Sequence, residues 1–160
     1  MGVNQRSQIT MSEAEVTSFL EGRRAMSMAT IGPDGRIQLV AMWYALLDGE
    51  IYVETKAKSQ KVANLRRDPR ITVMIEDGDY YDELRGVEFV GRAEITEDPD
   101  VLWQVGVSVF DRYQGGYTEE MKPFVEAMLH KRVAIHVAVE KTVSWDHRKL
   151  GLPPMRPAGA

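Results

Sequence analysis

The sequence predicts a mainly β protein with flanking helices (α+β), in which six antiparallel strands form a small barrel. Runs with apolar residues at alternate positions recur along the chain, which is the strand pattern. Turn sequences separate several of these runs, including Pro33-Asp34-Gly35 and Asp48-Gly49. Strands joined by tight turns pair antiparallel, and six strands in one small domain hide their edges best by curling into a barrel.

Length and composition agree with one soluble domain. The chain has 160 residues, enough for a single domain with its own core, so we expect one domain over residues 1–160 with extended tails at 1–10 and 151–160. Cysteine is absent, which excludes a disulfide framework and a thiolate nucleophile. No segment has the apolar length of a signal peptide or a membrane span. A cytoplasmic location without a membrane partner is therefore expected.

The first half of the chain is expected to hold one helix, three strands and a second helix. Ser12 and Glu15 form the capping-box pattern that starts a short amphipathic helix. Residues 24–55 are predicted to be three strands arranged as a meander, because two turn sequences divide them. Ser59 is then a suitable N-cap for a helix over residues 60–67.

The second half is expected to add two strands, a helical region and a last long strand. The strands are predicted over residues 70–77 and 87–96, where period-two apolar patterns return. Asp98-Pro99 opens the helical region, which residues 118–131 continue. Residues 132–145 give the last strand.

The segment after the strand at residues 51–55 is basic although the chain as a whole is acidic. The whole chain has 20 Lys and Arg against 24 Asp and Glu, and this balance argues against a general nucleic-acid binder. A helix starting at Ser59 would present free N–H groups and the positive end of its dipole, which together suit a phosphate group. A solvated basic helix face is the alternative interpretation. The basic residues are Lys56, Lys58, Lys61, Arg66, Arg67 and Arg70.

Residues 29–76 resemble the flavin- and deazaflavin-dependent oxidoreductases of the pyridoxamine 5'-phosphate oxidase-like superfamily, and the similarity continues through residues 88–96 and 151–157. The most specific part, SQKVANLRRDPR at residues 59–70, is similar to the branch that uses coenzyme F-420. The resemblance implies a six-stranded split barrel of the FMN-binding type. It also implies a homodimer that holds each cofactor in a groove between its subunits.

The resemblance further implies which residues contact the cofactor. The ring would lie against Gln38, Leu39, Val40, Ala41, Met42 and Trp43, and the phosphate against Glu54, Thr55, Lys56, Ser59, Gln60 and Lys61. Arg67 and Arg70 either join the phosphate site or interact locally with the helix end and Asp68. Trp43 either walls the ring pocket or fills the barrel core. Whether Tyr80, Tyr81, Trp145 or His147 line the site is left open.

The activity implied is transfer of a hydride from reduced F-420 to a conjugated small-molecule acceptor such as an enone, a quinone or a bilin. The alternatives are an FMN-dependent oxidase or reductase and a non-catalytic deazaflavin carrier. A basic track after Thr55 favours F-420, whose acidic oligoglutamyl tail extends beyond its phosphate. The cofactor performs such chemistry, so no catalytic side chain is assigned. No metal site is expected, because the three histidines lack zinc-ligand spacing.

Overall fold

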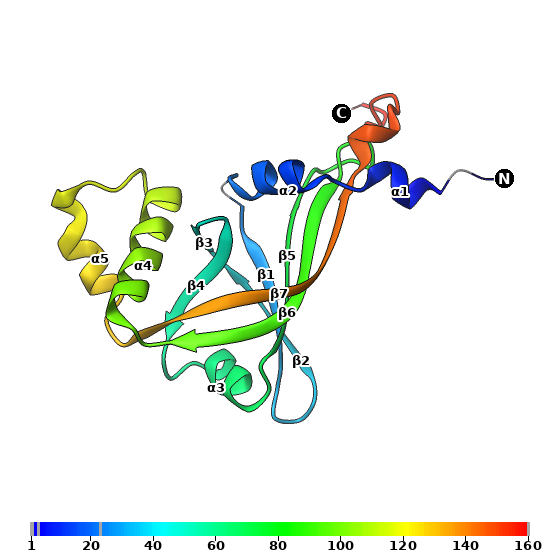
Figure 1. The fold of residues 1–160 in the computed structure, drawn as a ribbon. Coiled ribbons are helices and arrows are strands. Elements are labelled where there is room, and N and C mark those ends of the chain that lie inside the picture. The colour runs from blue at the N-terminus through cyan, green and yellow to red at the C-terminus, as the bar shows by residue number, and fades with distance from the viewer. Residues whose placement is uncertain (1, 3, 23, 160) are drawn as a thin grey trace.

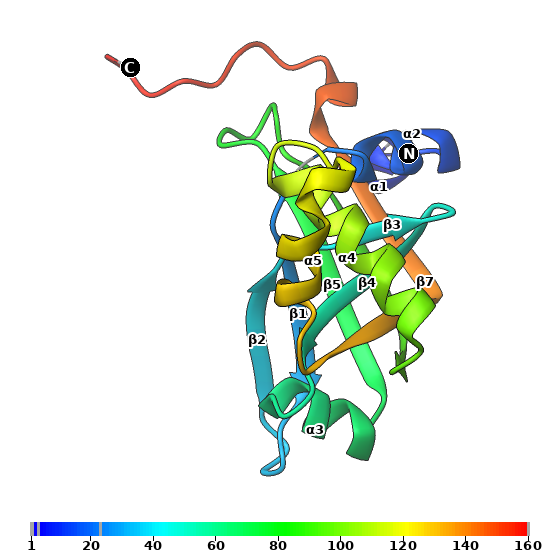
Figure 2. The same ribbon diagram turned by 90° about the vertical axis from the view of Figure 1, so that its left-hand side faces the viewer.

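The computed structural model describes residue 2, residues 4–22 and residues 24–159. Over these residues, seven strands form one antiparallel sheet in the order β2-β1-β5-β6-β7-β4-β3. The sheet curls on itself, with α2 across one end, α3 across the opposite end, and α4 and α5 to one side (Figures 1 and 2). The strands are β1 (Met26–Ile31), β2 (Ile37–Met42), β3 (Ala45–Leu47), β4 (Glu50–Lys56), β5 (Arg70–Asp77), β6 (Arg85–Thr96) and β7 (Arg132–Asp146).

The helices confirm most of the expected pattern. Ser12 Oγ accepts a hydrogen bond from the Glu15 N–H and the Glu15 carboxylate accepts one from the Ser12 N–H, which is the predicted capping box of α2. No helix in the described part of the chain combines the length and the apolar character needed to cross a bilayer. The helices are α1 (Gln5–Ile9), α2 (Glu13–Leu20), α3 (Gln60–Arg67), α4 (Pro99–Tyr113), η1 (Glu119–Met121), α5 (Lys122–Met128) and η2 (His147–Leu150).

The predicted meander and the strand count of six are wrong. The chain breaks between β2 and β3 at Trp43 and Tyr44, so this part of the sequence forms four strands. The hairpin β1-β2 lies at one edge of the sheet and the hairpin β3-β4 at the other, and β2 does not pair with β3. The reason is Tyr44, which is fully buried and donates a hydrogen bond to the Leu20 carbonyl oxygen at 2.6 Å. Because Tyr44 is held at Leu20, the chain crosses from one edge of the sheet to the other between β2 and β3. These two edge strands do not pair, so the barrel stays open between them.

The two ends of the chain differ from each other. Residues 5–9 form the helix α1, capped by the Asn4 side chain, so an extended tail over residues 1–10 is wrong. Residues 151–159 hold no helix or strand and are exposed. Arg156 fixes this segment by ion pairs with Asp82 and Glu83. Met1, Val3 and Ala160 lie outside the described residues.

The main core fills the inside of the curled sheet, and a smaller apolar cluster joins α4 to the strands. The long strands β6 and β7 take part in both halves of the sheet, and their register shifts between Val90 and Gly91. A side chain at Gly91 would collide with the Ala138 carbonyl oxygen of β7. Glycine therefore permits the bulge that helps β6 to bend around the core.

Candidate cofactor site

A small cavity brings together residues that the sequence places far apart. Its volume is about 250 Å³, and its lining includes Ala41, Met42 and Trp43 at the end of β2, Glu54 from β4 and Arg132 from β7. Four of these five residues were expected at the cofactor. Arg132 was not expected, because only the pairing of β7 with β4 brings it there.

Trp43 presents a flat aromatic surface at this cavity. Its side chain is half exposed, at 50%, and stacks on Tyr113 with ring centroids 4.9 Å apart and planes within 3°. The Tyr113 hydroxyl in turn donates a hydrogen bond to the Arg24 carbonyl oxygen at 2.8 Å, which holds the Tyr113 ring in place beneath Trp43. Filling of the barrel core by Trp43 is therefore excluded, and its role as a wall of the ring pocket stays a prediction.

The other ring-contacting candidates on β2 do not line this cavity. The side-chain oxygen of Gln38 accepts a hydrogen bond from buried Asn64 at 2.8 Å, and the Asn64 oxygen accepts one from Gln60 at 2.8 Å. Gln38 and Gln60 thus belong to a polar network between β2 and α3. Val40 packs against the core, whereas Leu39 faces outward and is 65% exposed.

The start of α3 contains an unsatisfied hydroxyl. Ser59 occupies the N-cap position, but its side chain makes no capping hydrogen bond, contrary to expectation. Ser59 Oγ is buried and has no hydrogen-bond partner among the described residues. Buried polar atoms are rarely left unpaired, so this hydroxyl and the free N–H groups of the first turn fit an anionic group placed against them.

Three cations gather beside this helix start. Lys56 and Arg132 are direct cross-strand partners on β4 and β7, so their side chains emerge next to each other. The pKa of Lys61 is lowered, first by its partial burial and then by the positive charges of Arg132 and Lys56. Thr55 lies on the core side of β4 and is buried, so its side chain is not part of this cationic cluster.

Glu54 sets the position of Arg132. Its carboxylate is largely buried, and Oε2 lies 3.0 Å from Nη1 of Arg132. Burial raises the pKa of Glu54, and the charge of Arg132 opposes that change. Glu54 balances one of the three cations, so the cluster of Lys56, Lys61 and Arg132 keeps a positive excess that attracts anions.

The arginines at the C-terminal end of α3 and directly after it already form ion pairs or hydrogen bonds within the chain. Arg66 pairs with Glu97 at 3.7 Å, and Arg67 donates to the Ile31 carbonyl oxygen at 2.5 Å. Arg70 pairs with Asp68 at 2.6 Å, and its hydrogen bonds lower the pKa of Asp68 to about 2. The pairing with Asp68 is therefore confirmed for Arg70, whereas Arg67 reaches the Ile31 carbonyl oxygen on β1 instead of Asp68. An uninterrupted basic track along α3 is not present.

The aromatic and histidine candidates near the strand ends lie elsewhere. His147 Nδ1 is 2.8 Å from the Tyr81 carbonyl oxygen, and the rings of these two residues contact edge to face at 4.5 Å. Arg156 covers the Tyr80 ring at 4.2 Å. Trp145 packs over Gly86. None of these four candidates lines the cavity at Trp43.

An open, curled antiparallel sheet with helices at both ends defines the split-barrel class of proteins. The family model for pyridoxamine 5'-phosphate oxidase matches residues 12–146, and the chain belongs to this family. The expected family and split-barrel fold are thus confirmed. This family includes oxidoreductases and binds flavins or deazaflavins.

Solved structures extend the comparison. A conserved hypothetical protein from Mycobacterium tuberculosis is 57% identical, with a TM-score of 0.93 and 99% of each chain covered. An F-420 reductase is 32% identical, with a TM-score of 0.62, covering 78% of this chain and 93% of its own. A heme storage protein from Vibrio cholerae shares the fold at 17% identity and a TM-score of 0.64, covering 82% of this chain and 94% of its own. A search of curated proteins found no significant match.

Proposed function

We propose that the protein binds coenzyme F-420 and transfers a hydride from its reduced form to a conjugated small-molecule acceptor. The observation that carries this proposal is the cationic start of α3, where Lys56, Lys61 and Arg132 lie close to one another and the buried Ser59 hydroxyl has no partner among the described residues. The 32% identity to an F-420 reductase supports a deazaflavin rather than FMN.

Each part of the site has a distinct task in this proposal. The first turn of α3, with Ser59 and Lys61, holds the phosphate, and Glu54 keeps the Arg132 guanidinium directed toward the same group. Trp43, supported by Tyr113, gives the ring a flat apolar wall that excludes water. When bound, reduced F-420 supplies a hydride from a ring carbon, and the matching proton comes from solvent. The protein's contribution is binding, orientation and shielding.

We expect F-420 to bind at least about tenfold more tightly than FMN, a difference of about 1.4 kcal/mol. Parallel titrations, following F-420 fluorescence and FMN fluorescence, measure both affinities. Tighter binding of FMN, or FMN co-purifying at full occupancy, would contradict the choice of cofactor. Turnover of reduced F-420 with enones, quinones or bilins separates an enzyme from a carrier, because a carrier would bind without oxidising the cofactor.

The proposal includes a homodimer that completes the cofactor groove. The edge strand β2 exposes Ile37 by 73% and Leu39 by 65% on one face, and Ile37 also lines an apolar groove of about 360 Å³ over β1, β5 and β6. An exposed apolar edge strand favours pairing with another chain.

Light scattering at micromolar concentration should give twice the chain mass of 18.1 kDa. Leu39→Lys should shift the protein toward monomer, because it places a charge in the proposed interface. Phe124→Lys is the matched control, since Phe124 is 65% exposed on α5, away from β2. A monomeric wild type, or a dimer that Leu39→Lys leaves intact, would contradict this interface.

A further inference from the structure

A second pocket lies at the end of the barrel opposite α3. Its volume is about 350 Å³, and its lining residues come from α2, the segment before β1, the start of β6, the end of β7 and η2. Figure 1 shows α2 at this end of the sheet. Its walls are partly apolar, with Met11, Ala14 and Phe19, and partly cationic. The pocket shares no lining residue with the cavity at Trp43, so the proposed cofactor site does not account for it.

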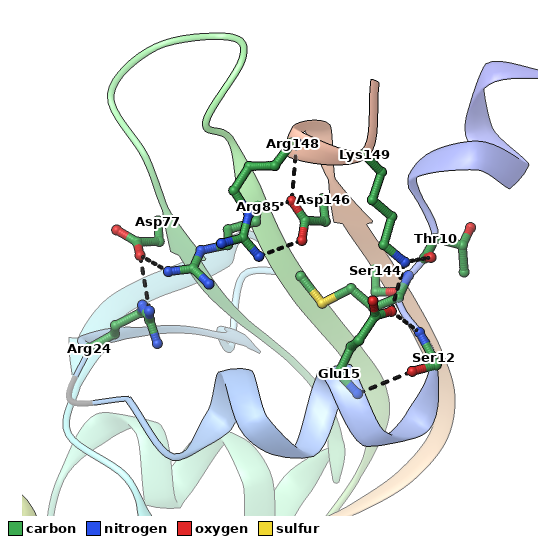
Figure 3. Close-up of polar contacts among 11 residues, drawn as sticks. Thr10, Ser12, Glu15, Arg24, Asp77, Arg85, Ser144, Asp146, Arg148 and Lys149 are labelled. Carbon is green, nitrogen blue, oxygen red and sulfur yellow. Dashed lines mark hydrogen bonds and ion pairs between the residues drawn. The ribbon is translucent and has the colours of Figure 1, made fainter. Parts of the chain in front are cut away.

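Three guanidinium groups line this pocket, and two carboxylates balance them. Arg24 and Arg85 both donate to the same oxygen of Asp77, each at 2.9 Å, whereas Arg148 forms its own pair with Asp146 at 2.7 Å (Figure 3). The hydrogen bond from Arg24 contributes most to the lowered pKa of Asp77, and that from Arg148 does the same for Asp146. Both carboxylates are therefore ionised at neutral pH, and among the described residues the three guanidinium groups carry one positive charge more than these two carboxylates cancel.

The neighbouring polar pair does not change this balance. Lys149 lies 2.7 Å from the Glu15 carboxylate, and the same ammonium group donates to the Thr10 carbonyl oxygen at 2.8 Å (Figure 3). Lys149 and Glu15 thus cancel each other's charge. The excess charge stays with the Arg24, Arg85 and Arg148 group.

Arg85 has the largest unused hydrogen-bonding capacity in this group. Its side chain is only 26% exposed, and among the described residues only Nη2 makes a hydrogen bond, to Asp77. A guanidinium has five N–H donors, so most of those on Arg85 remain available. The group also lies over the Phe19 ring, 5.3 Å from its centroid, which places the free donors beside an apolar wall.

We propose that this pocket binds a small monocarboxylate with an apolar body. A single negative charge matches this excess of one positive charge, whereas the second charge of a dianionic phosphate would meet no further counter-charge among the described residues of the pocket. A planar carboxylate matches the fork of a guanidinium, and Arg85 supplies free donors for it. Met11, Ala14 and Phe19 provide the surface that an aryl or alkyl group would cover.

Benzoate is the probe, with neutral benzamide and inorganic phosphate as comparison ligands. Calorimetric and NMR titrations of the full chain should show benzoate binding, weaker phosphate binding and no benzamide binding. Arg85→Gln should weaken benzoate binding at least about tenfold, because it removes a charge-assisted pair. Arg36→Gln is the matched control and should change nothing, since Arg36 is an exposed arginine in the β1-β2 turn that pairs only with Asp34 among the described residues.

A second variant keeps the test decisive if Arg85→Gln does not fold. Ala14→Trp fills the pocket from an exposed position on α2 and should abolish benzoate binding, whereas Thr17→Trp, on the same helix but outside the lining, should not. Lys61→Ala should leave benzoate binding unchanged.

Four results would overturn the proposal. These are no benzoate binding by the wild type, phosphate binding more tightly than benzoate, binding that survives Ala14→Trp, and binding lost with Lys61→Ala, which would assign the anion to the start of α3.

Discussion

Replacing Lys61 with alanine is expected to weaken F-420 binding about ten- to a hundredfold, or about 1.5–3 kcal/mol, because a charge-assisted hydrogen bond to phosphate is lost. Lys61 lies in the first turn of α3, close enough to Lys56 and Arg132 for their charges to lower its pKa. The fold should persist, since Lys61 is only partly buried and forms no ion pair with the described residues. Fluorescence titration of F-420 measures the change.

The lowered pKa of Lys61 adds a pH dependence. Burial and the two neighbouring cations favour the neutral amine, so the pKa of Lys61 is lower than that of an ordinary exposed lysine. Phosphate binding requires the protonated form. Wild-type affinity should therefore fall as pH rises toward this lowered pKa, and the fall should begin at a lower pH than for an exposed lysine. Lys61→Ala should flatten this part of the profile.

Lys141→Ala provides the control for the charge change, because Lys141 is an exposed lysine on β7. It should leave F-420 affinity unchanged apart from a few tenths of a kcal/mol. Raised salt should weaken wild-type binding more steeply than binding by Lys61→Ala, since one fewer charge contributes. If Lys61→Ala is folded and binds F-420 as tightly as the wild type, the phosphate does not lie at the start of α3.

Tyr44→Ala should lower the free energy of unfolding by about 3–5 kcal/mol, the usual cost of removing a large buried aromatic ring. Tyr44 is fully buried, and its hydroxyl donates to the carbonyl oxygens of Leu20 at 2.6 Å and Gly22 at 3.1 Å. Arg112 lies over its ring at 4.4 Å from the centroid. Loss of the ring therefore disturbs α2, α4 and the connection from β2 to β3 together. Urea unfolding monitored by circular dichroism measures the effect.

Two further variants separate the causes of this loss. Tyr44→Phe keeps the ring and should cost about 1 kcal/mol, because Arg112 continues to donate to the Leu20 and Gly22 carbonyl oxygens. Phe124→Ala removes an exposed ring on α5 and should change stability by less than about 0.5 kcal/mol. A Tyr44→Ala variant as stable as the wild type would show that the break at Tyr44 is not fixed by this packing.

Local patterns in the sequence determined most of the elements. Ser12 and Glu15 marked the start of α2, Asp98 and Pro99 marked the start of α4, and alternating apolar residues indicated most of the strands. These signals are local, because a cap or a period-two pattern depends on neighbours a few residues apart. The basic segment around Lys61 could be predicted as an anion site for the same reason, because its lysines are close together in the sequence.

Only the tertiary structure decided how these elements are connected and which groups meet. The burial of Tyr44 against Leu20 splits one predicted strand into two and sends β2 and β3 to opposite edges of the sheet. Pairing of β4 with β7 brings Arg132 beside Lys56, although 75 residues lie between them in the sequence. Long-range pairing depends on the packing of the whole core, which no local pattern encodes, and for this reason the sequence could indicate Lys61 but not Arg132.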